Sequence, residues 1–207
     1  MASTITHLAV AKKVLEQVEV DNIRDFFLGA IAPDISKQIG QNKEVSHFLF
    51  NTEQDIPNIS LFVKRYPLFK YNSFDLGYFT HLYTDKIWTE YFLPTFIKEN
   101  TVKLLTGETV EVTKEELQDM IYSDYTSLNT EIIDEYHLDL SLFYEEYVPP
   151  KTNFKEVPIE NLDILLNKIG IIIENAKSEK TYAIDFGRIR EFINRCADEI
   201  VREIKKY

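Results

Sequence analysis

The sequence contains 207 residues, enough for one sizeable hydrophobic core, and its hydrophobic fraction of 44% is typical of a globular protein. The 34 acidic residues against 23 basic ones give a net charge of −11, which disfavours binding to nucleic acid or to an anionic membrane surface. The single cysteine, Cys196, excludes an internal disulfide framework and favours a reducing compartment.

Apolar residues recur every three or four positions through most of the first hundred residues, which predicts helices. Side chains able to cap them stand at their starts, Thr4 or Thr6 for the first helix and Asp21 for the second. The residue before a proline avoids the α region, so Pro33 is expected to end the second helix. The expected elements are helices over 7–18 and 23–31, a polar loop over 34–45, an apolar segment over 56–66, and a helix that opens at Asn72 or Ser73 and reaches Pro94.

The second half predicts more helices and one hairpin. The residues TVKLLTGETVEV, at 101–112, alternate around a Thr-Gly pair and favour two short strands. Thr113 and Glu116 form a capping-box pattern for a helix to Tyr125, and a further helical turn is expected from Ser127. The remaining expected elements are a short helix over 139–147, an extended connector over 149–158, and two long helices over 159–177 and 185–206. The sequence therefore predicts an all-α protein of about eight helices.

The stretch GYFTHLYTDKIWTE contains two polar residues that a buried helix does not need, His81 and Asp85. Four residues apart, they lie one helical turn above each other, with Cβ atoms about 5–6 Å apart. Tyr78 and Leu82 share the stripe, which predicts that it faces inward. An imidazole and a carboxylate at this separation can share a metal ion. The same pair can also be a structural hydrogen bond in which the carboxylate fixes the ring tautomer.

Further candidate ligands stand where helices begin or break. His7 lies in the first expected helix, Asp34 follows the break at IAP, and His47 follows the polar loop. Imidazole and carboxylate together suit zinc, or another first-row divalent ion, better than calcium or magnesium. Three histidines and two aspartates exceed the needs of one tetrahedral ion. Either one ion takes four of them, or Asp85 bridges two ions, as in many hydrolases of phosphate esters.

Four motifs carry a family resemblance: ITHLAVAKKVLE, FFLGAIAPDI, SHF and GYFTHLYTDKIW, in this order over about 5–92. Together they resemble the zinc-dependent phospholipase C superfamily, whose relatives include the fungal single-strand nucleases. The resemblance implies an all-helical fold and hydrolysis of a phosphoester. It also implies that Asp34, His47, His81 and Asp85 are the ligands of one zinc, and that His7 with Asp85 is part of a second, adjacent site.

The sequence departs from that family in two places. Secreted members complete the second site with the α-amino group of a residue well upstream of the histidine, whereas here six residues precede His7 and no signal peptide is recognised. Members with three metals hold the third with another histidine and a His-x3-Glu pair. Here His137 is the last histidine and Ser141 stands four residues later. We therefore expect one or two ions, to which Glu90 or the run at 134–137 could add a ligand or general base.

These observations predict a function. Zinc would activate a water molecule as the nucleophile, and Asp34 or Asp85 could orient or deprotonate it. The prediction is a zinc-dependent phosphoric ester hydrolase, a phosphodiesterase resembling phospholipase C, that acts on a lipid or small-molecule phosphoester. The alternative is a non-catalytic metal-binding or structural helical protein on the same scaffold.

The organisation and location follow the same reading. We expect one all-α domain, 1–207, with a metal-site half over 1–100 and a C-terminal helical half over 113–207. No stretch approaches the ~18 apolar residues of a membrane span. We therefore expect a cytoplasmic protein with no stable membrane insertion and no nucleic-acid partner.

Overall fold

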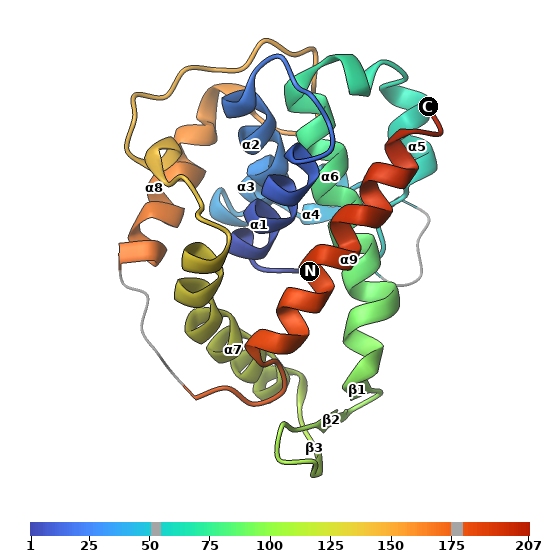
Figure 1. Ribbon diagram of the computed structural model, residues 1–207, viewed down its shortest axis with the longest axis vertical. Helices are drawn as coiled ribbons and strands as arrows, with labels where there is room; N and C mark the ends of the chain where they lie inside the picture. Colours follow the sequence, from blue (N-terminus) through green and yellow to red (C-terminus); the bar gives the residue numbers. More distant parts are fainter. Residues whose placement is uncertain (51–54, 175–179) are drawn as a thin grey trace.

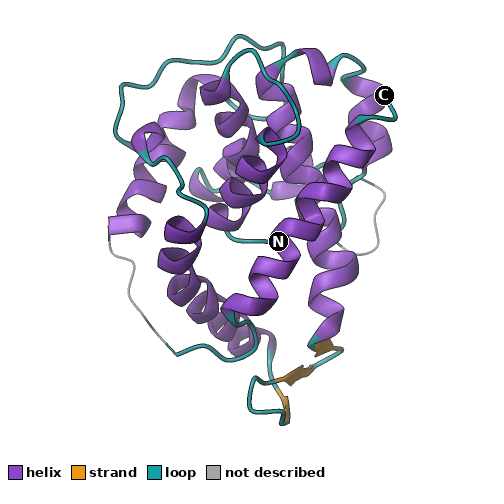
Figure 2. Ribbon diagram, viewed as in Figure 1, coloured by secondary structure: helices purple, strands orange, loops and turns teal. Residues whose placement is uncertain are grey.

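A computed structural model describes residues 1–50, 55–174 and 180–207. Over these ranges the chain folds into helices packed around one another, with a small sheet at one end (Figures 1 and 2). The all-α fold predicted from the sequence is confirmed. The α-helices are α1 Thr4–Leu15, α2 Ile23–Ile31, α3 Ile35–Gln38, α4 Lys43–Ser46, α5 Ile59–Arg65, α6 Ser73–Ile87, α7 Lys114–Glu135, α8 Leu162–Glu174 and α9 Phe186–Ile204.

The sheet contains the predicted hairpin and one more strand. Strands β2 (Thr101–Lys103) and β3 (Thr109–Glu111) pair antiparallel, with Val102 opposite Val110. The turn between them includes Gly107 at a φ of 91°, which glycine adopts without steric cost. Strand β1 (Ile97–Lys98) pairs with the other edge of β2. It is too short to leave a periodic signal in the sequence.

Two glycines bring α2 and α6 into close contact. A Cβ atom on Gly29 would lie 2.0 Å from the carbonyl oxygen of Phe74, and one on Gly77 would lie 2.0 Å from that of Phe26. Neither position can therefore hold a larger residue without moving the partner backbone. The absence of both side chains sets the spacing between α6, which carries His81 and Asp85, and α2, whose Ala30 carbonyl contacts His81.

The helix starts correct some expectations. The caps are Ser3 and Asn22, whose side chains accept the backbone N–H groups of Thr6 and Asp25; Thr4, Thr6 and Asp21, named from the sequence, do not fill that role. The prediction that Asn72 or Ser73 opens α6 is confirmed, since Asn72 caps it. After α6 the chain continues as a π-helical turn over Trp88–Phe92 and a 3-10 turn over Leu93–Thr95.

Several predicted boundaries were wrong. The stretch 34–45 is not all loop, because it includes α3 and the start of α4. Helix α7 runs without a break from Lys114 to Glu135, so the interruption expected between Tyr125 and Ser127 does not occur. Only a 3-10 turn, Ser141–Phe143, forms within the helix expected over 139–147. The last residues of the helix expected over 159–177, from 175 on, lie outside the described residues.

The C-terminal helices pack against the first helices of the chain. Helices α7 and α9 contact α1 and each other, and α8 contacts α3 (Figure 1). Buried apolar side chains from α1 through α9 form one cluster. That the chain forms one domain with a metal-site half and a C-terminal helical half stays a prediction. None of the helices in the described ranges is long and apolar enough to cross a membrane.

Candidate metal centre

Helix α6 presents His81 and Asp85 on its buried face. Both side chains are fully buried, and His81 Nε2 lies 3.3 Å from Asp85 Oδ2, as their spacing of one helical turn predicts. The adjacent threonines on the helix, Thr80 and Thr84, donate their hydroxyls to backbone carbonyls one turn earlier, so these hydroxyls do not donate to His81 or Asp85. The polar face is therefore left to His81 and Asp85.

The end of α2 fixes the orientation of the His81 ring. The carbonyls in the last turn of a helix have no partner within it. One of these, that of Ala30, lies 2.8 Å from His81 Nδ1. A carbonyl can only accept, so Nδ1 carries the hydrogen, and in the neutral ring Nε2 presents a lone pair. A backbone partner of this kind is what orients metal-binding histidines.

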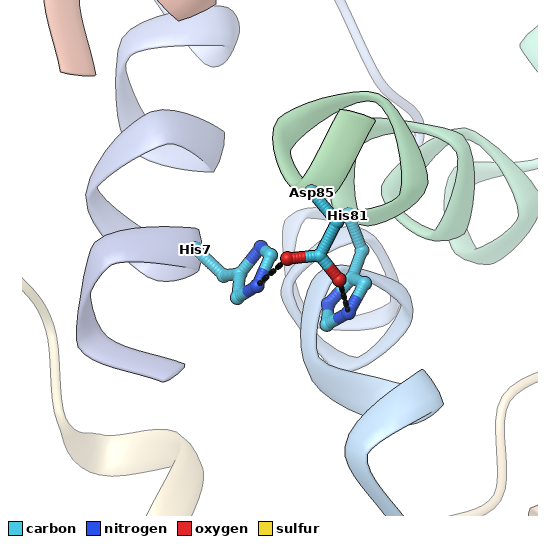
Figure 3. Close-up of side chains that lie close together, drawn as sticks. All are labelled: His7, His81 and Asp85. Atoms are coloured by element: carbon cyan, nitrogen blue, oxygen red, sulfur yellow. Dashed lines mark ion pairs between the residues drawn. The ribbon is translucent and has the colours of Figure 1, made fainter. Parts of the chain in front are cut away.

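The first group of possible ligands consists of His7, His81 and Asp85. Figure 3 shows the Asp85 carboxylate with one oxygen directed toward a ring nitrogen of His7 and the other toward a ring nitrogen of His81. Asp85 Oδ1 lies 3.3 Å from His7 Nε2 and also accepts the backbone N–H of Ala2 at 3.0 Å. The rings of His7 and His81 stack with centroids 3.7 Å apart. One potential ligand atom from each residue of this group lies within 4.8 Å of the others.

The second group consists of Asp34, His47 and His81, whose ligand atoms meet the same limit. Asp34 ends the 3-10 turn that follows α2, and its Oδ2 accepts the hydroxyl of Thr4 at 3.1 Å. His47 directly follows α4, and its Nδ1 lies 2.9 Å from the hydroxyl of Ser46. His47 Nε2 lies 3.3 Å from His81 Nε2, 3.7 Å from Asp34 Oδ1 and 3.8 Å from Asp85 Oδ2.

Lone pairs therefore converge where hydrogen-bond donors are scarce. His81 Nε2 faces His47 Nε2 and Asp85 Oδ2, and neither Asp85 Oδ2 nor His7 Nε2 has a hydrogen-bond partner among the described residues. Buried polar groups are normally paired. A divalent cation would satisfy these atoms together, and imidazole nitrogens with carboxylate oxygens are ligands that zinc accepts. The residues present fit a zinc ion.

The electrostatics keep both carboxylates ionised. Burial alone would raise the pKa of Asp85, but the neighbouring His7 and His81 outweigh it and hold the pKa well below its usual value. Burial opposes ionisation of Asp34 in the same way, and His47, His81 and His7 lower its pKa to about 2. Both aspartates are therefore anionic at neutral pH.

The pKa values of His7 and His81 are shifted in opposite directions. Burial and the neighbouring His81 lower the pKa of His7, so its ring is neutral and open to a metal. For His81, burial also acts to lower the pKa, but the Asp85 carboxylate outweighs it and the pKa is raised. A metal would have to displace a proton from His81 more than from His7.

All five residues named from the sequence thus meet at one place. The two groups share His81, whereas the resemblance implied that Asp85 is the shared ligand; Asp85 still lies near His47 of the second group. Glu90 pairs with Lys86 at 2.8 Å, and His137 is exposed beyond the end of α7. Neither of these belongs to a possible metal group in the described structure. That the five residues bind metal stays a prediction.

A pocket of about 200 Å³ adjoins the site at Asp34. The side chain of Asp34 is 19% exposed, whereas those of the other four residues are at most 1% exposed. The pocket wall includes residues that the sequence analysis missed, among them Lys37, Tyr122, Tyr125 and Asn129. The last three lie on one face of α7, and this recurrence of polar and aromatic residues at helical spacing was the available signal.

Residues 6–88 match the sequence model of the family described as zinc dependent phospholipase C. This part of the chain is therefore related to zinc-dependent phospholipase C, as the four ordered motifs predicted. The match ends at Trp88 and leaves α7, α8 and α9 uncovered. No curated protein and no solved structure matches the chain significantly.

Proposed function

We propose that this protein is a zinc-dependent phosphoester hydrolase. The observation that carries the proposal is the convergence of ring nitrogens and carboxylate oxygens from His7, Asp34, His47, His81 and Asp85 on one buried place next to a pocket. A purely structural cluster would not need two carboxylates and three imidazoles that lack enough hydrogen-bond donors for one another. The family match over residues 6–88 supports zinc as the metal.

The chemistry divides between the ion and the chain. A zinc ion bound here would lower the pKa of a water molecule to near 7 and neutralise charge on phosphoryl oxygens. The inner residues His7, His81 and Asp85 would hold the ion from its buried side. Asp34 is partly exposed and ionised, so it is placed to bind the ion and to orient the attacking water, or to accept its proton, at the pocket. We propose Asp34 and Asp85 as the catalytic carboxylates, and we propose that each chain binds one or two zinc ions.

The substrate class follows from the pocket and the family. The match to the zinc-dependent phospholipase C family suggests a lipid phosphoester as the substrate. The small volume of the pocket also suits a soluble phosphodiester or phosphomonoester. The single, buried Cys196 is consistent with a reducing, cytoplasmic location. Both assignments are part of the proposal.

Two measurements on one sample test the function. Elemental analysis of the purified protein gives the metal-to-protein ratio, and hydrolysis of a chromogenic phosphodiester by zinc-loaded protein gives activity with and without chelator. We expect one or two zinc ions per chain and chelator-sensitive hydrolysis. Zinc without hydrolysis of diesters or monoesters would support the non-catalytic metal-binding alternative, and a protein that takes up no transition metal would contradict the hydrolase and leave a purely structural role.

A further inference from the structure

Lys37 lines the same pocket as Asp34, one helical turn further along the chain. Asp34 directly precedes α3 and Lys37 lies within α3, three residues later, so the two residues are on the same side of this turn. Both line the pocket of about 200 Å³ that adjoins the candidate metal centre. Among the described residues of the pocket wall, Lys37 has the only cationic side chain. In a chain with a net charge of −11, it provides a local positive charge beside the centre.

Tyr122 of α7 holds the Lys37 ammonium at the pocket. The ammonium donates to the Tyr122 hydroxyl and lies 4.7 Å from the centre of the ring. An ammonium has three hydrogens, so two donors remain after this bond, and the Tyr122 hydroxyl keeps its own hydrogen. Within the described ranges Lys37 forms no ion pair, with Asp34 or any other acid, and the Tyr122 hydroxyl has no acceptor. The pair therefore presents unused donors and an unneutralised charge.

Both donors are open to solvent. Lys37 is exposed and Tyr122 is 44% exposed, so a molecule in the pocket can reach them. The non-bridging oxygens of a phosphoryl group only accept hydrogen bonds and carry negative charge, and charge-assisted bonds from an ammonium suit them. A volume of about 200 Å³ is below the usual range of ligand pockets, so the group held inside is small.

The charge of the metal centre makes Lys37 matter most for a dianion. The Asp34 and Asp85 carboxylates are both ionised, so together they neutralise the two charges of one zinc ion held with neutral imidazoles. A phosphoryl group then finds its countercharge on the pocket wall. Coulombic attraction is proportional to the charge of each partner, so Lys37 attracts a dianionic phosphate monoester twice as strongly as a monoanionic diester.

We infer that Lys37, held in place by Tyr122, binds a non-bridging phosphoryl oxygen of the substrate and makes the site favour phosphate monoesters over diesters. This inference rests on the proposed hydrolase function and names the substrate class of the same site. Lys37 acts as a substrate-binding residue and Tyr122 as the residue that positions it. Neither is a metal ligand.

The test is a binding measurement that does not depend on turnover. Methylphosphonate represents a monoester and dimethylphosphinate represents a diester, because a methyl group replaces one oxygen and neither probe contains a phosphoester bond to cleave. Zinc-loaded protein is titrated calorimetrically with each probe, at a pH above the second ionisation of methylphosphonate. We expect the wild type to bind methylphosphonate more tightly than dimethylphosphinate.

Variants assign this preference to Lys37. Lys37→Met keeps a long side chain and removes the charge, so methylphosphonate should bind about tenfold more weakly. Dimethylphosphinate should bind only about threefold more weakly, because half the charge gives half the free energy. Lys37→Arg should retain the preference. Tyr122→Phe keeps the ring and should lose part of the preference, because the hydroxyl no longer holds the ammonium.

Lys43→Met is the matched control. Lys43 pairs with Asp55 at 2.6 Å and does not line the pocket, so its replacement removes the same charge elsewhere. The two probes should bind to this variant as they do to the wild type. All variants should keep the zinc stoichiometry of the wild type.

The outcomes separate the two proposals. A zinc-loaded wild type without the preference overturns the inference about Lys37 and leaves the hydrolase proposal standing. So does a Lys37→Met variant that weakens both probes by the same factor, because a purely structural contact between α3 and α7 would have that effect. Absence of zinc from the wild-type samples overturns the proposed function, and the substrate inference falls with it.

Discussion

Two fully buried carboxylates, one in each half of the molecule, differ in what surrounds them. Asp124 in α7 accepts three consecutive backbone N–H groups, from residues 182–184, at 2.5–3.0 Å. Asp85 in α6 accepts one backbone N–H group, that of Ala2, and otherwise faces histidine nitrogens. Backbone N–H groups keep their hydrogens at any ordinary pH, so Asp124 has a structural role and joins α7 to the segment before α9. Ring nitrogens can exchange a proton for a metal, so Asp85 is placed for chemistry.

The surroundings also act in opposite directions on the two acids. Burial raises the pKa of Asp124, and its backbone hydrogen bonds only partly oppose this. The histidines around Asp85 overcome the same burial and lower its pKa. A buried carboxylate thus indicates a functional site through the kind of donor that faces it, rather than through burial alone.

The largest expected effect comes from the packing that positions Asp85. Gly77→Ala places a Cβ 2.0 Å from the carbonyl oxygen of Phe26 and 2.9 Å from the backbone nitrogen of Ala30. Both contacts are backbone, so α2 and α6 must separate. We expect a loss of about 3 kcal/mol or more in the free energy of unfolding, measured by denaturant titration, together with loss of zinc, because the Ala30 carbonyl would no longer hold the His81 ring.

Gly170 in α8 is the matched control in the other half. The nearest atom to a Cβ there, in Phe143, lies 3.8 Å away, an ordinary contact. Gly170→Ala should leave stability unchanged or raise it by about 0.4–1 kcal/mol, since alanine favours helix and restricts the unfolded chain. Equal destabilisation by Gly77→Ala and Gly170→Ala would show that the close contact of α2 with α6 has no special role.

The second effect compares the two acids directly. Asp85→Asn removes a ligand charge and should weaken zinc binding by ~10-fold or more, because loss of a direct ligand costs at least as much as loss of an outer partner. Asp124→Asn should lower the free energy of unfolding by about 1–3 kcal/mol and leave the zinc stoichiometry unchanged. Elemental analysis and melting temperature, each with and without chelator, measure both. Equal metal content in wild type and Asp85→Asn would exclude Asp85 as a ligand.

The third prediction is a pH dependence within the metal half. In metal-free protein, NMR titration should place the pKa of His81 above 6.5 and that of His7 below it. The stabilising contribution of His81 is complete below pH 6.5 and is lost as the pH rises through its raised pKa. His7 has the opposite sign, because the unfolded chain binds the proton more readily, so its contribution is lost as the pH falls below 6.5.

Zinc should abolish both titrations until the pH is low enough to release the ion, since a metal-bound nitrogen cannot take a proton. If the two rings titrate in zinc-loaded protein as they do in metal-free protein, neither is a ligand.

The smallest expected effect is that of the remaining histidine. His137 is exposed beyond α7, in a left-handed conformation with a φ of 47°. His137→Ala should change neither the zinc stoichiometry nor the activity, because the His-x3-Glu pair of a third site is absent from the sequence. His47→Ala, measured beside it, should lose zinc. A loss of one ion per chain in His137→Ala would contradict the expectation that His137 binds no metal.

The proximity of the five candidate ligands could be predicted from the sequence because its signals are local. His81 and Asp85 share a helix face by spacing alone, and the ordered motifs placed His7, Asp34 and His47 with them. The caps at Ser3 and Asn22 were missed because neighbouring residues have the same capping chemistry, and only the backbone geometry decides among them.

The other half was harder to predict because its roles depend on distant contacts. Asp124 reads as an ordinary polar residue of α7 until residues 182–184 fold against it. Asn129 lines the pocket only because α7 lies beside Asp34, which is far away in the sequence. Periodicity reports which face of a helix is buried, but it does not report which element covers that face.

The exposure of the site falls from Asp34 inward to His7, His81 and Asp85. The side chains of these inner three residues are at most 1% exposed, so we expect an ion that they hold to leave only when α1, which carries His7, moves relative to α6, which carries the other two. Such opening is a local fluctuation whose rate belongs to the protein and does not depend on the chelator. The rate of zinc release should therefore level off as the chelator concentration rises. The limiting rate would equal the rate at which these two helices separate.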